Sequence, residues 1–243
     1  MIDVHSHITF DIDDGCRTLE ESLKVINNLK ELGFSKIVLT PHYLYDSKYC
    51  ANNKIKLSKL NDLKKEVKKN NINIDLYLGN EIYINFHIED LIKQKEIYPM
   101  NNTKYLLIEL SMYNEINEAM DYLYELRLKG YIPVIAHPER YRYFQRNYQK
   151  MDELYESGVL FQCNYGSIIG QYGKDAQKLL KYALKKDMVT FMGTDIHRPD
   201  SLVVNSFDKA VRKLKKIVGD KKFKEITESN ALKMINGKEI EYK

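Results

Sequence analysis

The chain has 243 residues, of which 44% are hydrophobic and 30% charged, with a formal net charge of +4. This balance is ordinary for a globular protein, and the basic residues alternate with acids instead of clustering, which argues against nucleic-acid binding. The sequence contains no apolar run of the roughly 18 residues that a membrane-spanning helix needs, and it does not open with a secretory signal pattern. We therefore expect a cytoplasmic protein that is not embedded in a membrane and binds no nucleic acid.

The three cysteines are odd in number and widely spaced, at Cys16, Cys50 and Cys163. No two of them form a CxxC pair, so a disulfide framework or a zinc ribbon is not indicated. A packing role is favoured for Cys16.

Seven short apolar segments are typical of buried parallel strands, which form continuous apolar runs. They span residues 2–7, 36–40, 74–79, 105–110, 131–137, 159–164 and 189–194. Helical periodicity fills most of the intervals. In the first interval, Thr18 and Glu21 form a predicted capping box and Gly33 a C-cap. Further helices are expected at about 53–70, 115–129, 148–157, 173–187, 204–218 and 221–235.

The alternation of strand and helix predicts a single α/β domain over residues 1–243, with no linker that would divide it. Three glycines, Gly130, Gly158 and Gly219, fall where helices are expected to stop. A closed or nearly closed barrel is favoured. A doubly wound open sheet is the alternative, because seven successive parallel strands fit both architectures.

Five of the six histidines lie at or just beyond the predicted carboxyl ends of strands, and three acids share this placement. These eight residues are His5, His7, His42, His137, His197, Glu81, Glu109 and Asp195. In an α/β barrel the strand ends converge on one face. Imidazole and carboxylate groups are common ligands of divalent transition metals, and carboxylates can bridge two ions. The sequence therefore predicts a polynuclear metal site at that face.

Spacing supports the same interpretation. His5 and His7 are two residues apart, so on a strand their side chains point to one side, and Asp195 and His197 have the same spacing.

Other polar residues nearby give weaker signals. Asp11 or Asp13 is expected to cap the turn before Gly15 or to support the ligands from outside. The sixth histidine, His87, is expected to be structural or on the surface.

Six motifs follow one another along the chain: HSH, LTPH, NEIY, IELS, VIAHPER and TDIH. As an ordered set they resemble the motif series of the PHP (polymerase and histidinol phosphatase) superfamily of metal-dependent phosphoesterases. The opening MIDVHSHITFDIDDG, with LGNEIYI and VIAHPERY, is most similar to the bacterial PHP-type protein-tyrosine phosphatases that regulate capsular and exopolysaccharide synthesis. The resemblance runs from residue 1 to at least His197.

This resemblance implies a distorted (β/α)7, TIM-like barrel of the PHP fold with two to three divalent ions, manganese first and iron or zinc as alternatives. The implied first ion is held by His5, His7, Glu81 and Asp195. The second is shared by Glu81, Glu109 and His137. The third is completed by His42, His197 and Asp14.

Four residues are implied in catalysis. Arg140, from the HPER motif, is placed to hold the phosphate, since a guanidinium fork suits a phosphoryl group. The candidate proton donors to the leaving phenolate are a metal-bound water, His42 and His197. Arg198 is the only arginine in the loop after the last DxH motif, at a spacing that departs from the family pattern. For Arg198 and for Arg17 a structural salt bridge is the alternative.

The implied reaction is hydrolysis of phosphotyrosine by a metal-activated hydroxide, and the implied partner is the tyrosine-rich tail of a kinase that controls polysaccharide synthesis. Cysteine-based phosphatase chemistry is excluded, because it needs an arginine six residues after the cysteine. Here those positions hold Ser22, Lys56 and Ile169. Two alternatives stay open: another PHP phosphomonoesterase such as a histidinol-phosphate phosphatase, and a non-catalytic metal-binding regulatory protein.

Overall fold

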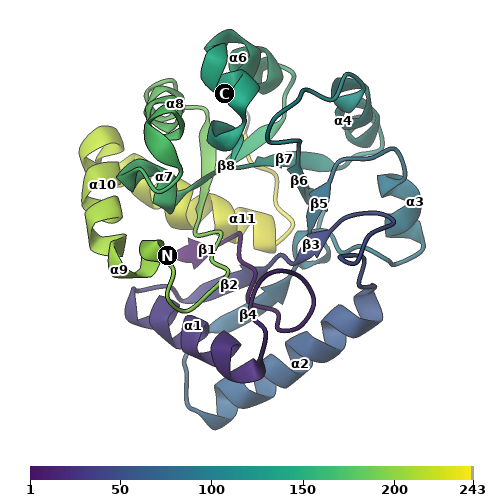
Figure 1. Ribbon diagram of the computed structural model, residues 1–243, viewed down its shortest axis with the longest axis vertical. Coiled ribbons are helices and arrows are strands. Elements are labelled where there is room, and N and C mark those ends of the chain that lie inside the picture. Colours follow the sequence, from purple (N-terminus) through teal and green to yellow (C-terminus); the bar gives the residue numbers. More distant parts are fainter. Residues whose placement is uncertain (242–243) are drawn as a thin grey trace.

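The computed structural model describes residues 1–241, in which helices surround a central ring of strands (Figure 1). Nine strands form within these residues, and every strand pairing is parallel. The strands are β1 (Ile2–Asp3), β2 (Lys36–Leu39), β3 (His42–Tyr43), β4 (Asp75–Leu78), β5 (Glu81–Tyr83), β6 (Tyr105–Glu109), β7 (Ile132–Ala136), β8 (Leu160–Asn164) and β9 (Val189–Gly193).

The strands form two sheets, β1-β2-β4 and β3-β5-β6-β7-β8-β9, because two of the seven predicted strands are interrupted. The second predicted strand breaks at Thr40 and Pro41 and continues as β3, and proline offers no backbone donor for strand pairing. The third breaks at Gly79 and Asn80 and continues as β5. A Cβ at Gly79 would lie 2.7 Å from the Met100 sulfur, so the chain passes too close for a side chain.

The ring closes between the first and last strands near their carboxyl ends. The backbone N–H of Asp195 donates to the carbonyl of His5 at 2.8 Å, and the N–H of His7 donates to the carbonyl of Ile196 at 2.9 Å. Ser6 and Ile196 form an isolated parallel bridge at the same place. The expected distorted barrel is thus confirmed, with its strands split over two sheets.

Most predicted helices are present. The Thr18 hydroxyl accepts a hydrogen bond from the Glu21 N–H at 3.2 Å, and Gly33 takes a left-handed φ of 88° after the first helix, as the capping signals predict. The helices are α1 (Leu19–Glu31), α2 (Asn53–Lys69), α3 (Ile88–Lys93), α4 (Ala119–Leu128), α5 (Arg142–Arg146), α6 (Tyr148–Glu156), α7 (Tyr165–Ile169), α8 (Gly173–Lys185), α9 (Leu202–Asn205), α10 (Phe207–Lys224) and α11 (Asn230–Ile235), with short 3-10 turns η1 (Met100–Asn102) and η2 (Pro138–Arg140) and a π-helical segment η3 (Glu225–Ser229).

Three helix boundaries differ from the prediction. Helix α4 begins at Ala119, later than the expected residue 115. Gly219 kinks α10 with a φ of 76° instead of ending it. The expected helix 221–235 is therefore shared among α10, η3 and α11. None of the described helices is long and apolar enough to cross a bilayer.

Two apolar clusters hold the barrel together. The larger one lies between the strands and the outer helices. The smaller one joins alternate strand residues, among them Ile2, Leu107 and Phe191, to Met234 and Ile235 of α11. Side chains two apart on a strand share a face, so this second cluster is the inner face of the ring. Helix α11 therefore fills the barrel from the end where the strands begin, and the opposite end is left for polar side chains.

Candidate metal centre

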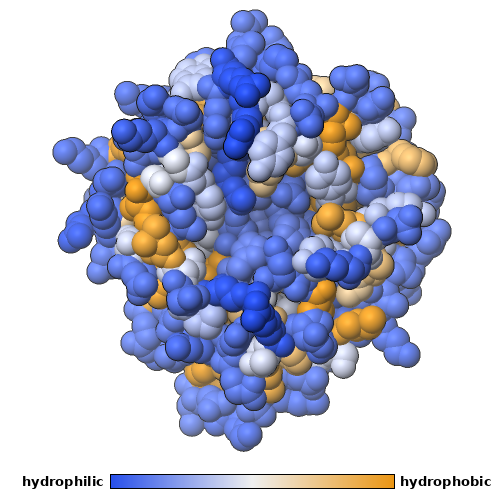
Figure 2. All heavy atoms as spheres, in the orientation of Figure 1, coloured by the Kyte–Doolittle hydropathy of each residue, from blue (hydrophilic) through white to orange (hydrophobic). Residues whose placement is uncertain are grey.

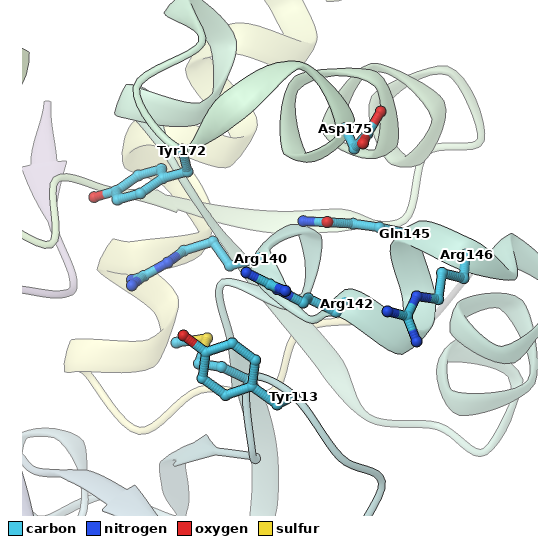
Figure 3. Close-up of a pocket in the computed structure, with 8 residues that line it drawn as sticks. Tyr113, Arg140, Arg142, Gln145, Arg146, Tyr172 and Asp175 are labelled. Atoms are coloured by element: carbon cyan, nitrogen blue, oxygen red, sulfur yellow. The ribbon is translucent and has the colours of Figure 1, made fainter.

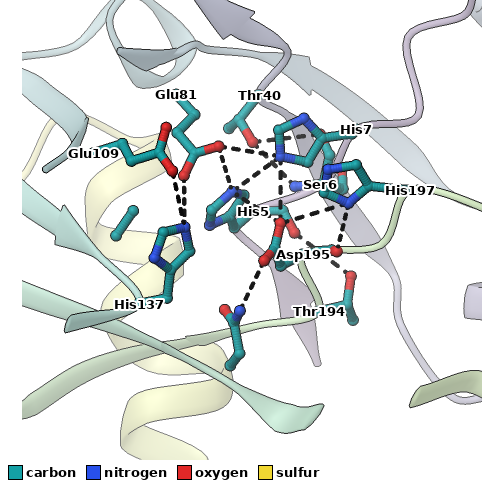
Figure 4. A network of polar contacts seen from close by, with 12 residues as sticks. His5, Ser6, His7, Thr40, Glu81, Glu109, His137, Thr194, Asp195 and His197 are labelled. Atoms are coloured by element: carbon teal, nitrogen blue, oxygen red, sulfur yellow. Dashed lines mark hydrogen bonds and ion pairs between the residues drawn. The ribbon is translucent and has the colours of Figure 1, made fainter. Parts of the chain in front are cut away.

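The carboxyl ends of the strands carry a buried polar centre. On this face the middle of the molecule is hollowed and hydrophilic, while apolar residues lie toward the rim (Figure 2). Five histidines and four acids converge here from β1, β3, β5, β6, β7 and β9 or from the loops that follow them. These are the nine predicted ligands, His5, His7, Asp14, His42, Glu81, Glu109, His137, Asp195 and His197. Figure 4 shows seven of them: His5, His7, Glu81, Glu109, His137, Asp195 and His197.

Four of these side chains meet at one point. The Nε2 atoms of His5 and His7 lie 3.2 Å apart, and Oε2 of Glu81 lies 3.2 Å from each. Oδ1 of Asp195 lies 3.4 Å from Nε2 of His5 and 3.3 Å from Nε2 of His7. The HxH spacing therefore does bring both imidazoles to one place.

The outer nitrogens of these two rings fix which nitrogen carries a hydrogen. Nδ1 of His5 lies 2.7 Å from the amide oxygen of Gln162, and Nδ1 of His7 lies 2.8 Å from a carboxylate oxygen of Asp13. Both partners are acceptors, so each Nδ1 is the donor and each neutral ring presents a lone pair at Nε2. When both rings are neutral, two nitrogen lone pairs and two carboxylate oxygens face one another, an arrangement that fits a cation.

The raised pKa values of two residues in the cluster show that the site also favours positive charge. Burial lowers the pKa of His5, but the carboxylates of Glu81 and Asp195 more than offset this effect and raise it to about 9. Burial and the neighbouring Glu81 carboxylate raise the pKa of Glu109 to about 8. Protons are thus drawn into the cluster, and a divalent cation would release them on binding.

Glu81 links this group to the next. Its Oε1 accepts from Nε2 of His137 at 2.8 Å, and its Oε2 lies 3.0 Å from Nδ1 of His42. That last pair makes no hydrogen bond, so both atoms are buried without a hydrogen-bond partner. The Glu109 carboxylate stands further off, 3.8 Å from Nδ1 of His42 and 3.9 Å from Nε2 of His137. The atoms left without a hydrogen-bond partner, and so free to bind a metal ion, therefore lie at and beside the Glu81 carboxylate.

The outer part of the cluster faces solvent. Oδ1 of Asp14 lies 3.6 Å from Nε2 of His42 and 3.5 Å from Nε2 of His197. A hydrogen bond from His197 lowers the pKa of Asp14 to about 2, against the effect of burial. The Asp14 side chain is 51% exposed, so this group forms the mouth of the centre.

The geometry divides the nine residues into four overlapping groups, each with ligand atoms within 4.8 Å of one another. The groups are His7, Asp14, His42 and His197; His5, His7 and Glu81; His5, His137 and Asp195; and His42, Glu81 and Glu109. The implied grouping by ion places His137 with Glu109, whereas these groups separate them. All donors are nitrogen or oxygen, as borderline and hard divalent ions prefer.

Backbone conformation aims two of these side chains. His137 follows β7 with a φ of 34°, and Asp195 follows β9 with a φ of 53°. Left-handed φ values are uncommon for residues other than glycine and tend to occur at functional sites. At both positions the chain turns sharply as its strand ends, which directs the side chain into the cluster.

Of the predicted arginines, only Arg140 contacts a residue of the cluster. Its Nη1 donates to Oδ2 of Asp195 at 2.6 Å, and its guanidinium lies over the ring of Tyr172 at 4.4 Å. Arg198 instead donates to the carbonyl of Gly15 and lies 3.5 Å from the carboxylate of Glu21. These contacts match the structural alternative for Arg198, and its phosphate-binding role stays a prediction.

The residues with weaker signals lie around the centre. Asp13 takes both of its predicted roles, because Oδ1 accepts from the Gly15 N–H at 2.9 Å while Oδ2 supports His7. Asp11 is exposed and pairs with Lys59 at 3.4 Å. Cys16 is buried in the apolar cluster. His87 stacks with Tyr45 and Phe86, apart from the other five histidines.

Sequence reasoning missed two amides on β8. Gln162 supports His5, and Nδ2 of Asn164 donates to Oδ2 of Asp195 at 2.8 Å. Both occur in the segment VLFQCN, whose apolar residues predict only a buried strand. The signal was present, because an amide within an otherwise buried strand needs a polar partner.

The family model for CpsB/CapC proteins of capsular polysaccharide synthesis matches residues 1–236. The chain belongs to this family. It is 35% identical over 239 residues to CapC of Staphylococcus aureus, covering 98% of this chain and 90% of that protein. It is 31% identical over 245 residues to the tyrosine-protein phosphatase CpsB of Streptococcus pneumoniae, covering 97% and 98%.

A solved structure agrees with this membership. It comes from a study of YwqE from Bacillus subtilis and CpsB from Streptococcus pneumoniae, described as unique metal-dependent tyrosine phosphatases. It superposes on this chain with a TM-score of 0.88 and 28% identity, covering 100% of this chain and 97% of that one. The family resemblance inferred from the ordered motifs is therefore confirmed.

Proposed function

We propose that this protein is a metal-dependent protein-tyrosine phosphatase. The observation that carries the proposal is the meeting of four acceptor atoms, from His5, His7, Glu81 and Asp195, beside the Arg140 guanidinium. The named activities of CpsB and YwqE support phosphotyrosine as the substrate class. The family description supports a role in capsular polysaccharide synthesis, and the phosphorylated partner that we propose is a kinase that controls capsular or exopolysaccharide synthesis.

The nine clustered side chains are the proposed ligands of two to three divalent ions, manganese first. When bound, such ions supply Lewis acidity toward phosphoryl oxygens and lower the pKa of a bound water. The chain's residues do the rest. Gln162 and Asp13 hold the rings of His5 and His7 in the tautomer that presents Nε2.

Arg140 is proposed to bind and orient the phosphoryl group. Its hydrogen bond to Asp195 and its stacking on Tyr172 restrict the side chain, while 25% of it remains exposed to an incoming anion. A planar fork of donors matches two phosphoryl oxygens at once. Its charge would stabilise the negative charge of the transition state.

His42 and His197 are the proposed proton donors to the leaving phenolate. Both lie at the mouth, with side chains 15% and 30% exposed, whereas His5 and His7 are fully buried. A donor must reach the leaving oxygen from the open side of the centre. Because phenolate is a fair leaving group, losing proton donation alone should lower the rate less than losing Arg140.

The deciding experiment compares wild-type protein with His137→Ala, loaded with Mn²⁺, on a phosphotyrosine peptide and on histidinol phosphate. We expect bound metal by elemental analysis and turnover of the peptide, with both strongly reduced in His137→Ala. The matched control is His87→Ala, which removes the one histidine outside the centre. Preference for histidinol phosphate by orders of magnitude would assign the site to a small metabolite.

Equal and negligible turnover in wild type and His137→Ala, with metal still bound, would favour a regulatory metal-binding protein.

A cytoplasmic location forms part of the proposal. It is supported by the three cysteines, Cys16, Cys50 and Cys163, which are all free, as expected in a reducing compartment.

A further inference from the structure

A groove lies beside the metal centre, and apart from Arg140 its lining residues have no role in the proposed hydrolysis. It encloses about 520 Å³ between the loop after β6, the segment η2–α5 and the start of α8 (Figure 3). Its lining residues are Met112, Tyr113, Arg140, Arg142, Gln145, Arg146, Tyr172 and Asp175. We call it the arginine groove.

The groove begins at the metal centre. Arg140 belongs to both, because it lines the groove while its Nη1 donates to Asp195. Arg142 and Arg146 continue outward on α5, four residues apart and thus about one helical turn from each other. The close-up shows the three arginines in a row, with Tyr172 on one side and Tyr113 on the other (Figure 3).

The charges on the outer two arginines are not neutralised. Among the described residues, no acid forms an ion pair with Arg142 or Arg146, and both side chains are exposed. Asp175 is the one acid of the lining, and its carboxylate pairs with Lys178 at 3.1 Å. The guanidinium of Arg142 lies over the ring of Tyr113 at 4.8 Å, and that ring is 63% exposed.

We propose that the arginine groove is a subsite for acidic side chains that flank the phosphotyrosine in a peptide, and that Arg142 and Arg146 determine this preference. The inference rests on the proposed phosphatase function. A peptide whose phosphate reaches Arg140 must leave the centre along some path, and this path is lined with guanidinium groups. An extended peptide advances about 3.3–3.6 Å per residue, so the row spans several substrate positions.

Guanidinium groups bind carboxylates through two parallel hydrogen bonds, and complementary charge also speeds encounter. Arg142, already stacked on Tyr113, loses little freedom when a carboxylate binds. Because both side chains are exposed, the attraction should weaken with salt. The expected effect is therefore on KM and kcat/KM at low ionic strength, more than on kcat.

The test uses two phosphotyrosine peptides that differ only in flanking glutamates or glutamines, with the full-length protein in Mn²⁺. Wild type should hydrolyse the glutamate peptide with a kcat/KM about tenfold higher, and added salt should reduce this ratio. The double variant Arg142→Gln/Arg146→Gln should bring the ratio close to one. The control Arg212→Gln removes an exposed arginine of α10, outside the groove, and should keep the wild-type ratio.

A wild-type ratio near one, or an unchanged ratio in the double variant, overturns the proposal while the phosphatase function stands. If no phosphotyrosine substrate is hydrolysed, the same peptides carrying a phosphonate in place of the phosphate decide the matter by fluorescence anisotropy. Tighter binding of the glutamate peptide to wild type than to the double variant supports the groove, and equal binding rejects it.

Discussion

Arginines line clefts on two sides of the metal centre, and the two clefts use them differently. The arginine groove holds three arginines and one aspartate, and that aspartate pairs with a lysine outside the lining. The second cleft, about 610 Å³, holds equal numbers of acids and bases: Arg17, Lys24 and Arg198 with Glu20, Glu21 and Asp200. We call it the paired cleft.

In the paired cleft the guanidinium of Arg198 is bound within the protein, whereas among the described residues neither Arg17 nor Lys24 forms an ion pair. Arg198 donates to the Gly15 carbonyl and lies beside Glu21, whose carboxylate also accepts from the backbone N–H of Arg17 at 2.8 Å. An arginine close to a phosphate-binding centre therefore indicates little until its partners are known. A guanidinium can bind substrate only if no group of the protein already occupies it, however close it lies to the centre.

Removing the metal should abolish the proposed hydrolysis of phosphotyrosine. We expect a chelator to reduce phosphotyrosine turnover by at least about 1000-fold, and added Mn²⁺ to restore it, because the proposed nucleophile depends on the ion. The measurement is turnover before and after reconstitution. Turnover that survives verified metal loss would contradict the proposed chemistry.

Metal affinity should also depend on pH. In the ion-free protein the pKa of His5 is about 9 and that of Glu109 about 8, so both bind protons at neutral pH. A cation must displace those protons, hence lowering the pH from 8 to 6 should weaken Mn²⁺ binding. Calorimetry in two buffers of different ionisation enthalpy would count the protons released, and no release would contradict the site.

Arg140→Ala should give the next largest effect. Losing one preorganised donor to the developing charge typically costs about 100-fold or more in rate, so we expect kcat/KM to fall by about that factor. Arg140→Lys should recover only part of it, since lysine lacks the fork. A loss below about threefold would place phosphate binding elsewhere.

Arg198→Ala should affect stability more than turnover. It removes a hydrogen bond to the Gly15 carbonyl in the turn that follows the HSH segment, which we expect to cost about 1 kcal/mol of unfolding free energy. Urea denaturation measures this loss, and kcat/KM should change less than about threefold. A rate loss like that of Arg140→Ala would instead assign Arg198 the phosphate-binding role implied by the resemblance.

Glu21→Gln should have the smallest effect. The Arg198–Glu21 pair is partly exposed, with side chains 30% and 35% exposed, and such pairs contribute roughly 0.2–1 kcal/mol. We expect a small drop in unfolding free energy and normal turnover. An increase in turnover would show that pairing with Glu21 keeps Arg198 from binding substrate. The two clefts would then be more alike than their charges indicate.

The sequence predicts the metal centre better than its surroundings. His5, His42 and Asp195 come from distant parts of the chain, yet each follows an apolar run, and parallel strands must bring such positions together. The capping signals at Thr18 and Gly33 can likewise be recognised from a short stretch of sequence, and the structure confirms them. The span of the single domain, residues 1–243, stays a prediction.

The rest depends on contacts that local patterns do not encode. The break at Gly79 reflects a close approach to Met100, which is set by the tertiary fold. Whether Arg142 or Arg198 is free depends on which acid folds against it, and no spacing rule reveals that. An amide at Gln162 indicates that some polar partner is needed, but that the partner is His5, 157 positions away, is set by the fold.

The placement of α11 has a consequence for how this protein is made. Its Met234 and Ile235 share one apolar cluster with Ile2 and Val4, so the first and last parts of the barrel pack against each other. While a ribosome is still adding residues before Asn230, the inside of the ring has no lid and stays open to water. Until Met234 and Ile235 have been added, the apolar cluster that contains Ile2 and Val4 therefore stays incomplete.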